Sequence, residues 1–134
     1  MRLLLDTHIA LWALEDSPRL PARARELILD ASNQVFVGVA SIWEVQIKHA
    51  AHPNRMVVDG PRFCALCQQA GYELVPIEAG HVLRLARITR AEGSRPHNDP
   101  FDRILLCLAI EENMRFVTHD SLIPDYEETC VLLV

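Results

Sequence analysis

The sequence lacks the features that would direct the protein to a membrane or an export route. No apolar run comes near the ~20 residues that a transmembrane helix needs. The N-terminal stretch MRLLLDTHIALWALEDS begins apolar, but Asp6 and His8 interrupt it and no small-residue cleavage site follows. We therefore expect this stretch to belong to the folded domain and not to a signal peptide, and we expect the protein to be cytoplasmic.

Positive charge is also scarce. The chain has 13 Lys and Arg residues against 18 Asp and Glu residues, for a net charge of −5, and Lys48 is the only lysine. This balance argues against a broad basic face and against tight non-specific binding of nucleic acid. Arginine does, however, suit planar, bidentate contact with phosphate. Nucleic acid binding would therefore require a local arginine rim or a bound metal ion.

Paired cysteine motifs are nearly absent. Of the four cysteines, only Cys64 and Cys67 are closely spaced, in the segment CALC. A zinc ribbon needs a second such pair, and a redox pair usually follows a strand directly. The histidines of the segment HAAH (49–52) have no adjacent acidic or cysteine partner, so they are an equally weak metal signal. We expect four reduced and at least partly buried thiols.

What the sequence does contain is an alternation of strands and helices. Its 134 residues, half of them hydrophobic, suit one domain over residues 1–134. The predicted strands are RLLLD, QVFVGVA, YELVPI, RFVTHD and TCVLLV, and the predicted helices are THIALWAL, PARARELILDAS, SIWEVQIKHA, RFCALCQQA, AGHVLRLARITRA and a segment starting near residue 99. This order predicts an α/β fold with a mainly parallel central sheet in an α/β/α arrangement of three layers. The continuous apolar strands indicate that helices cover both faces.

Four acidic residues are predicted to lie at one edge of this sheet, where parallel sheets bind their ligands. Asp6 and Asp120 follow strands, whereas Glu44 and Asp102 fall in the first turns of helices that start at the same edge. Each residue also has a local alternative. Asp6 suits a helix cap, Ser41 and Glu44 form an S-x-x-E capping box, and Asp120 suits a turn.

The segment HNDPFDRILLCLA (97–109) contains two aspartates just before an apolar helical run. Asp99 suits the N-cap, Pro100 the first helical position, and Asp102 the first turn, where a carboxylate faces the positive end of the helix dipole. An ordinary helix start therefore explains this segment as well as a ligand site does.

Gathering all these acids in one place carries an energetic penalty. Carboxylates about 5 Å apart repel each other by roughly 3 kcal/mol per pair at an effective dielectric constant of about 20. A helix N-terminus offsets only about 0.3–1 kcal/mol. A fold that brings the acids together must therefore raise their pKa values or bind a cation. An oxygen-only set of ligands favours Mg²⁺ or Mn²⁺ over zinc.

The segments LLLDTHIALW, ASIWEVQIK, HNDPFDRILLCLA and FVTHD resemble the successive motifs of the PIN-domain family, and most closely those of VapC-type ribonuclease toxins. The resemblance covers nearly the whole chain in the family's order and implies a single PIN-like domain. By this resemblance, the family's acidic quartet corresponds to Asp6, Glu44, Asp102 and Asp120. Asp99 falls on an additional acid common in the DPFDR subgroup. The sequence departs from the family at His119, where arginine is usual, and in the loosely similar stretch HAAHPNRMVVDG.

The resemblance implies an Mg²⁺-dependent endoribonuclease that cleaves single-stranded RNA, with Mn²⁺ also supporting activity. It further implies a homodimer neutralised by a cognate antitoxin protein. In this interpretation Asp6, Asp102 and Glu44 hold the ion, and Asp120 orients the attacking water or helps to hold a second ion. Thr7 and Arg103 are candidate contacts to the RNA, and each also has an ordinary structural explanation.

Three other functions remain open on the sequence alone. A nuclease directed at DNA or at a nucleic acid structure would use the same acids. A non-catalytic, PIN-like RNA-binding module would have no reason to keep mutually repelling carboxylates. A phosphate-accepting receiver domain also clusters aspartates, but it needs a lysine after a late strand, whereas Lys48 lies in an early helix.

Overall fold

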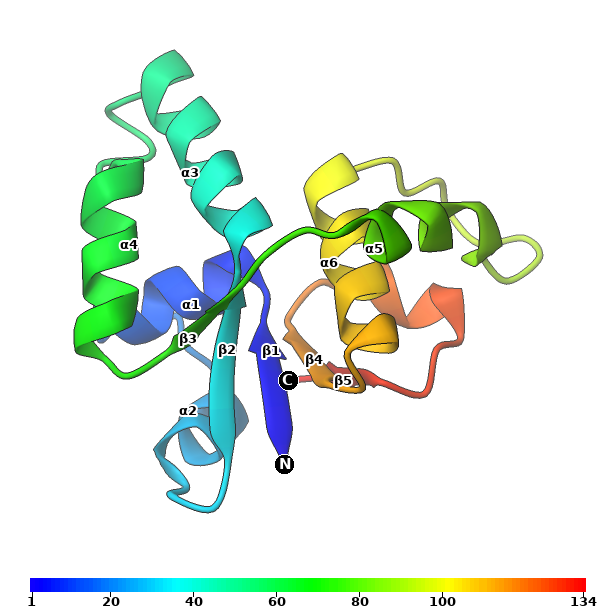
Figure 1. Ribbon diagram of the computed structural model, residues 1–134, viewed down its shortest axis with the longest axis horizontal. Helices are drawn as coiled ribbons and strands as arrows, with labels where there is room; N and C mark the ends of the chain where they lie inside the picture. The colour runs from blue at the N-terminus through cyan, green and yellow to red at the C-terminus, as the bar shows by residue number, and fades with distance from the viewer.

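A five-stranded sheet lies at the centre of the computed structural model, which describes residues 1–134 (Figure 1). The strands are β1 (Arg2–Leu5), β2 (Gln34–Gly38), β3 (Glu73–Val75), β4 (Arg115–Thr118) and β5 (Val131–Leu133). They lie in the order β3-β2-β1-β4-β5, and all neighbours are parallel. The helices are α1 (Thr7–Leu14), α2 (Ala22–Leu29), α3 (Val39–Ala51), α4 (Gly60–Gln69), α5 (Ala79–Arg84) and α6 (Pro100–Glu111), with the short 3-10 helices η1 (Leu85–Arg87) and η2 (Ile123–Tyr126).

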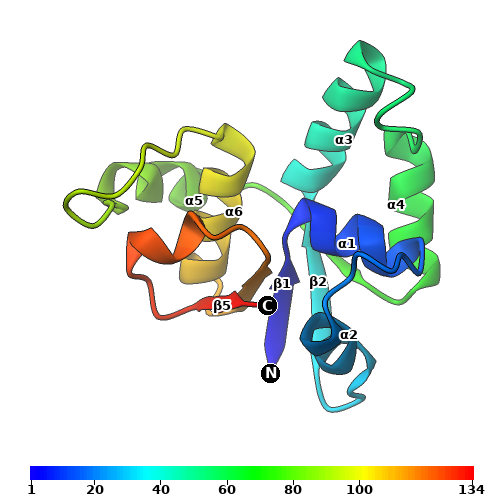
Figure 2. The ribbon, with the colours of Figure 1, turned by 180° about the vertical axis from the view of Figure 1, so that it is seen from behind.

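Helices cover both faces of the sheet, as the apolar strands predicted. Leu3 and Leu5 of β1 point into an apolar cluster shared with α1, α2 and α4, whereas Leu4 points into a second cluster built mainly on α6. Helices α1 and α2 lie over the face that is seen in Figure 2. The three-layer α/β/α fold is therefore confirmed, and the sheet is parallel throughout.

The parallel arrangement brings the carboxyl ends of β1, β2 and β4 to one edge of the sheet. Asp6 follows β1 directly and is the N-cap of α1. Its backbone N–H donates to the carbonyl oxygen of Val117 in β4 at 2.9 Å, which ties the first residue after β1 to the neighbouring strand. The start of α6 is also as predicted, since Asp99 caps the helix and Pro100 is its first residue.

Helix α3 begins two residues earlier than predicted, with Gly38 as its N-cap. The expected capping box of Ser41 and Glu44 is therefore wrong: Ser41 lies inside the first turn, and Glu44 lies in the second turn. Helix α6 approaches this helix start closely, because a Cβ atom on Gly38 would come within 2.7 Å of the buried Leu105 side chain. Glycine lets the chain leave β2 and enter the helix without displacing that leucine.

The segment AGHVLRLARITRA is helical only in its first part. Helix α5 passes into η1, and the backbone is extended at Ile88 (φ −87°, ψ 131°). Ile88 is buried in the cluster around α6. Arg90 then donates hydrogen bonds to the carbonyl oxygens of Arg95 and Leu122. These contacts with distant parts of the chain end the helix earlier than its apolar spacing indicates.

All four cysteines are free thiols, as expected. Cys67 and Cys107 are buried, and burial raises the pKa of Cys67 to about 12. None of the helices combines the length and the apolar character needed to cross a membrane.

Candidate active site

The five acids singled out in the sequence line one cavity of about 360 Å³ at the carboxyl edge of the sheet. These acids are Asp6, Glu44, Asp99, Asp102 and Asp120. The other residues that line the cavity are His8, Ile9, Trp12, Lys48 and His119. Residues far apart in the sequence therefore share one wall, as the strand order predicts.

Asp6 is held rigidly on the floor of the site. It is only 6 % exposed, and its carboxylate accepts hydrogen bonds from the backbone N–H of Thr7 at 2.7 Å and from the Thr118 hydroxyl at 2.6 Å. Burial raises the pKa of Asp6 against these two hydrogen bonds, and the charge of Glu44 adds to the increase. The two hydrogen bonds fix the orientation of the Asp6 carboxylate, and a nearby positive charge would stabilise its ionised form.

Glu44 is almost completely buried, at 2 % exposure. Its Oε2 atom pairs with the ammonium group of Lys48 one helical turn later, whereas its Oε1 atom has no hydrogen-bond partner. Burial alone would lower the pKa of Lys48, but the pairing with Glu44 outweighs it and the pKa is raised. One oxygen of a buried carboxylate is therefore left available to a ligand in the cavity.

Asp102 is a second acid of the site with a strongly raised pKa. Burial raises the pKa of Asp102 to about 8, and the charges of Asp6, Asp99, Glu44 and Asp120 add to the increase. Asp99 supports the same helix end, because its Oδ1 atom accepts from the backbone N–H groups of Phe101 and Asp102 at 2.9 and 3.2 Å. Asp99 is thus both a helix cap and part of the cavity wall.

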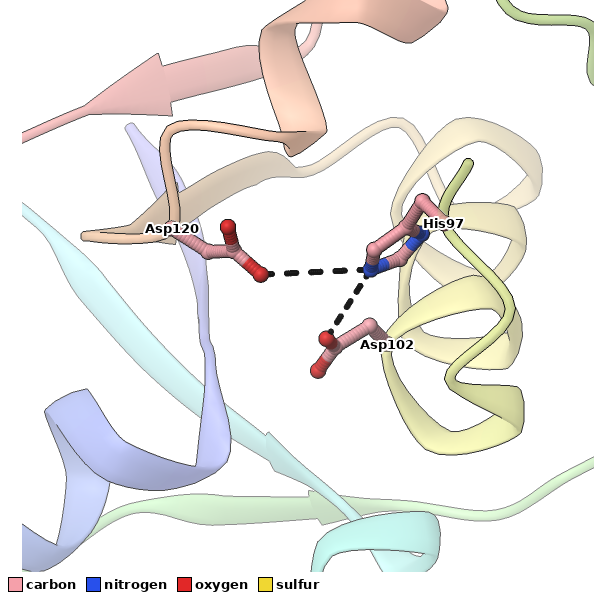
Figure 3. A group of neighbouring side chains, drawn as sticks. All are labelled: His97, Asp102 and Asp120. Atoms are coloured by element: carbon pink, nitrogen blue, oxygen red, sulfur yellow. Dashed lines mark hydrogen bonds and ion pairs between the residues drawn. The ribbon is translucent and has the colours of Figure 1, made fainter. Parts of the chain in front are cut away.

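His97 lies between Asp102 and Asp120 (Figure 3). Its Nε2 atom is 3.2 Å from Oδ2 of Asp102 and 3.9 Å from Oδ2 of Asp120. One ligand atom from each of these three residues lies within 4.8 Å of the other two. The other oxygen of Asp120 accepts from the backbone N–H of Leu122 at 2.9 Å. His97 therefore bridges the two acids that the loop after β4 and the start of α6 bring together.

The partners of His97 indicate its tautomer. The contact of Nε2 with two carboxylates favours the tautomer with the proton on Nε2, which then donates to Asp102, while Nδ1 lies 2.7 Å from the Tyr126 hydroxyl oxygen and accepts from it. The imidazole is buried, and burial lowers the pKa of His97 in spite of the nearby charge of Asp120. A neutral imidazole satisfies both contacts.

Two residues that the resemblance offered as RNA contacts do not line the cavity. Thr7 is fully buried, and its hydroxyl pairs with that of Ser41 at 2.8 Å. It therefore joins the start of α1 to the first turn of α3. Arg103 lies in α6, next to Asp102, but outside the cavity lining.

The model of the PIN domain family matches residues 3–128. This chain belongs to the PIN domain family. Comparison with the curated proteins finds no significant match.

The PIN domain is also similar to solved structures at low sequence identity. One is a crystal structure of VapBC2 from Rickettsia felis bound to a DNA fragment from their promoter, with a TM-score of 0.66, 16 % identity, and coverage of 100 % of this chain and 98 % of that chain. Another is VapBC-1 from nontypeable Haemophilus influenzae, with a TM-score of 0.62, 15 % identity, and coverage of 95 % and 91 %. At these identities the similarity concerns the fold.

The cavity of this PIN domain fits a divalent cation, which PIN domains typically bind. The unpartnered Oε1 atom of buried Glu44 needs a ligand, because an unsatisfied buried oxygen of a charged group is strongly unfavourable. The raised pKa values of Asp6 and Asp102 indicate the same deficit of positive charge. The ammonium group of Lys48 compensates only one of the five carboxylates.

Two groups of this PIN domain escaped the sequence analysis as parts of the acidic site. Lys48 was noted as the sole lysine and for its place in an early helix, but not as a partner of Glu44, although the i, i+4 spacing of the two residues was a usable signal. The sequence analysis also did not place the Nε2 atom of His97 among the carboxylates, where the structure has it. His97 stands five residues before Asp102 in a polar loop, and no local pattern indicates where its ring points.

Proposed function

We propose that this chain is an Mg²⁺-dependent endoribonuclease that cleaves single-stranded RNA, with residues 1–134 acting as one PIN domain. The observation that carries the proposal is the cavity, which is lined by five carboxylates, one of which, Glu44, has a buried oxygen with no partner. PIN domains are generally metal-dependent nucleases. Mn²⁺ is expected to support activity as well, since it accepts the same oxygen ligands.

The proposed roles follow from how each acid is held. Asp6, Glu44 and Asp102 hold the ion directly or through water, since Mg²⁺ usually takes one or two carboxylates and keeps several waters. When bound, the ion lowers the pKa of the attacking water and neutralises charge on the phosphate. Asp120 is less buried and orients that water or helps to hold a second ion. Asp99 is an additional, less direct candidate, because its Oδ1 atom caps α6.

His97 is proposed as a positioning residue and not as a metal ligand. Both of its ring nitrogens are already used, Nδ1 by Tyr126 and Nε2 by Asp102. The ligand set then consists of oxygen atoms, which supports Mg²⁺ or Mn²⁺ over zinc.

The biological setting is part of the same proposal. The fold is similar to structures of VapBC proteins, and the sequence motifs resemble VapC-type toxins. We therefore propose that the chain is the toxin of a toxin–antitoxin pair, that it acts in the cytoplasm as a homodimer, and that a cognate antitoxin protein neutralises it. An arginine of the antitoxin suits the exposed side of the acidic cavity, because a guanidinium group pairs well with carboxylates.

A cleavage assay tests the proposal directly. The protein is expected to cut single-stranded RNA with Mg²⁺, to lose this activity with a chelator, and to leave DNA of the same sequence intact. Asp6→Asn should reduce cleavage by more than about a hundredfold, because the amide oxygen can still accept from Thr7 and the amide N–H can donate to the Thr118 hydroxyl, but the charge is lost. Asp16→Asn is the matched control, since Asp16 is 82 % exposed and outside the cavity.

The outcomes separate the alternatives. Cleavage of DNA in preference to RNA would replace the proposal with a DNA-directed nuclease. Binding of RNA without cleavage at any Mg²⁺ or Mn²⁺ concentration would indicate a non-catalytic module. Sequencing of the RNA ends after expression of the parent and of Asp6→Asn would identify the cleaved RNA.

A further prediction concerns His97. Replacing it with alanine removes the hydrogen bond that holds Asp102, so we expect the Mg²⁺ concentration for half-maximal cleavage to rise about 10–100-fold. His97→Gln should recover much of this loss, because its amide N–H can donate to Asp102. Mg²⁺ titrations of cleavage rate measure the effect, and equal Mg²⁺ requirements in the parent and His97→Ala would contradict the positioning role.

A further inference from the structure

The acidic cavity adjoins a second hollow of opposite charge. This hollow has a volume of about 280 Å³ and is lined by His8, Lys48, His52, Arg55 and Met56, with no acidic residue among them. His8 and Lys48 also line the acidic cavity, so the two hollows share a wall. In a chain with a net charge of −5, a cationic hollow directly beside the candidate active site marks a place for an anion.

The basic hollow is built by a fixed turn at the end of α3. The backbone N–H groups of Arg55 and Met56 both donate to the carbonyl oxygen of His52 at 3.0 Å. His49 fastens the turn from the helix, with its Nδ1 atom 2.7 Å from the carbonyl oxygen of Met56. Arg55 forms no ion pair with an acid of the chain, so its guanidinium group keeps its donors for a ligand. Lys48, in contrast, is already paired with Glu44.

The indole of Trp12 borders the acidic cavity on another side. Trp12 lines the acidic cavity and also a third hollow of about 260 Å³, to which Arg19 and Arg55 contribute. The rings of His8 and His119 approach that of Trp12, with centroids 5.9 and 6.1 Å away. The guanidinium carbon of Arg19 lies 5.9 Å from the centroid of the indole. Trp12 is partly exposed, so its ring is accessible to another planar group.

Single-stranded nucleic acid presents the groups that this arrangement would recognise. Its phosphates pair with arginine in bidentate fashion, and its bases stack on aromatic side chains and on arginine. A phosphate at the acidic cavity requires a cation there, whereas the next phosphate of the strand requires positive protein side chains. His8 lines both the acidic cavity and the basic hollow, so the two kinds of lining lie side by side, as two successive phosphates would require.

We propose that His8, His52 and Arg55 bind the backbone phosphate next to the one that is cleaved, and that Trp12 stacks on a base of the same strand. The proposal rests on the proposed function for the identity of the cleaved strand. In this proposal the nucleic acid strand runs along the turn after α3 and along α1. That turn lies in the stretch HAAHPNRMVVDG, which is only loosely similar to the family's motifs.

Binding measurements on uncleaved RNA test the phosphate site. A fluorescein-labelled single-stranded RNA is titrated with the Asp6→Asn protein, with and without Arg55→Gln. Arg55→Gln should weaken binding about tenfold and reduce the slope of log Kd against log salt concentration by about 0.7. Arg115→Gln removes the same charge at the opposite edge of the sheet, at the start of β4, and should change Kd less than about twofold.

Steady-state cleavage separates this site from the proposed function. In the cleaving protein, Arg55→Gln should raise KM about tenfold and leave kcat nearly unchanged. Normal cleavage with an unchanged KM and an unchanged Kd would overturn the phosphate site and leave the proposed function intact. RNA binding that depends on Arg55, in a parent protein that does not cleave, would support the site and refute the nuclease. Weakened binding of poly-glutamate with unchanged binding of RNA would overturn the site in favour of an acidic peptide.

Trp12 provides a second, independent measurement. The chain has two tryptophans, so Trp43→Phe leaves Trp12 as the only indole. Stacking of a base should quench its fluorescence on addition of RNA, and quenching should saturate at the same RNA concentration as the anisotropy signal. Trp12→Leu should weaken binding about tenfold. Unchanged fluorescence together with unchanged affinity would overturn the stacking role.

Discussion

Asp102→Asn is expected to abolish RNA cleavage while making the metal-free protein more stable at pH 7. Asp102 is 14 % exposed and surrounded by four other carboxylates, which together with burial raise its pKa from 3.8 to about 8. The asparagine carbonyl can still accept the hydrogen bond from His97. The variant therefore keeps the shape of the site and loses the charge that the proposed reaction needs.

The sign of the stability change follows from proton linkage. The folded protein binds a proton at Asp102 between pH 4 and 8 and the unfolded chain does not, so the free energy of unfolding falls as pH rises through this interval. The unfolded chain releases the proton of Asp102 near pH 4, whereas the folded protein keeps it up to about pH 8. At 1.36 kcal/mol per pKa unit, this difference lowers the stability of the parent at pH 7 by up to about 4 kcal/mol relative to pH 3. Asparagine does not titrate, so Asp102→Asn avoids this loss.

Denaturant unfolding with a chelator present measures this effect. Asp102→Asn should match the parent near pH 4 and exceed it increasingly up to pH 8, while Asp16→Asn should follow the parent within about 0.5 kcal/mol at both ends. Cleavage by Asp102→Asn within threefold of the parent would contradict the proposed role of Asp102. A stability difference that does not change with pH would contradict the clustering of the acids.

The fold and the acidic cavity could be predicted because their signals are local and repeated along the chain. Each strand is a short apolar run, and in a parallel sheet the residues that follow β1 and β4 must reach the same edge. Asp6 and Asp120 are such residues, and Asp99 shows a complete helix-start pattern with Pro100. Each of these acids has an ordinary local explanation when taken alone. Together they would repel one another at one edge of the sheet, and this repulsion is what predicted a cation site.

What could not be predicted depends on contacts between distant segments. Helix α3 starts at Val39, directly after a glycine that lies against Leu105, and no pattern around residue 38 reveals that leucine. The orientation of His97 depends on Tyr126, which lies 29 residues later in an unpredicted 3-10 helix. The basic hollow requires the turn after α3 to fold back toward His8, which spacing alone does not indicate.

Mg²⁺ affinity is expected to rise about a hundredfold between pH 5.5 and pH 7.5. The ion must displace the proton that Asp102 holds below a pKa of about 8, and a ligand that binds in competition with one proton gains nearly tenfold in affinity per pH unit below that pKa. Saturating metal should also stabilise the fold, by about 2.7 kcal/mol at a hundred times its Kd.

Calorimetric titration at the two pH values, in buffers with different ionisation enthalpies, gives both the affinity and the number of protons released. The parent should release close to one proton per bound ion at pH 6.5. Asp102→Asn should bind weakly and depend less on pH than the parent, because the proton at residue 102 no longer competes, whereas Asp16→Asn should behave as the parent. Tight binding without proton release would mean that the ion does not contact Asp102. The raised pKa would then be relieved by another partner, with the antitoxin's cationic side chain as the next group to test.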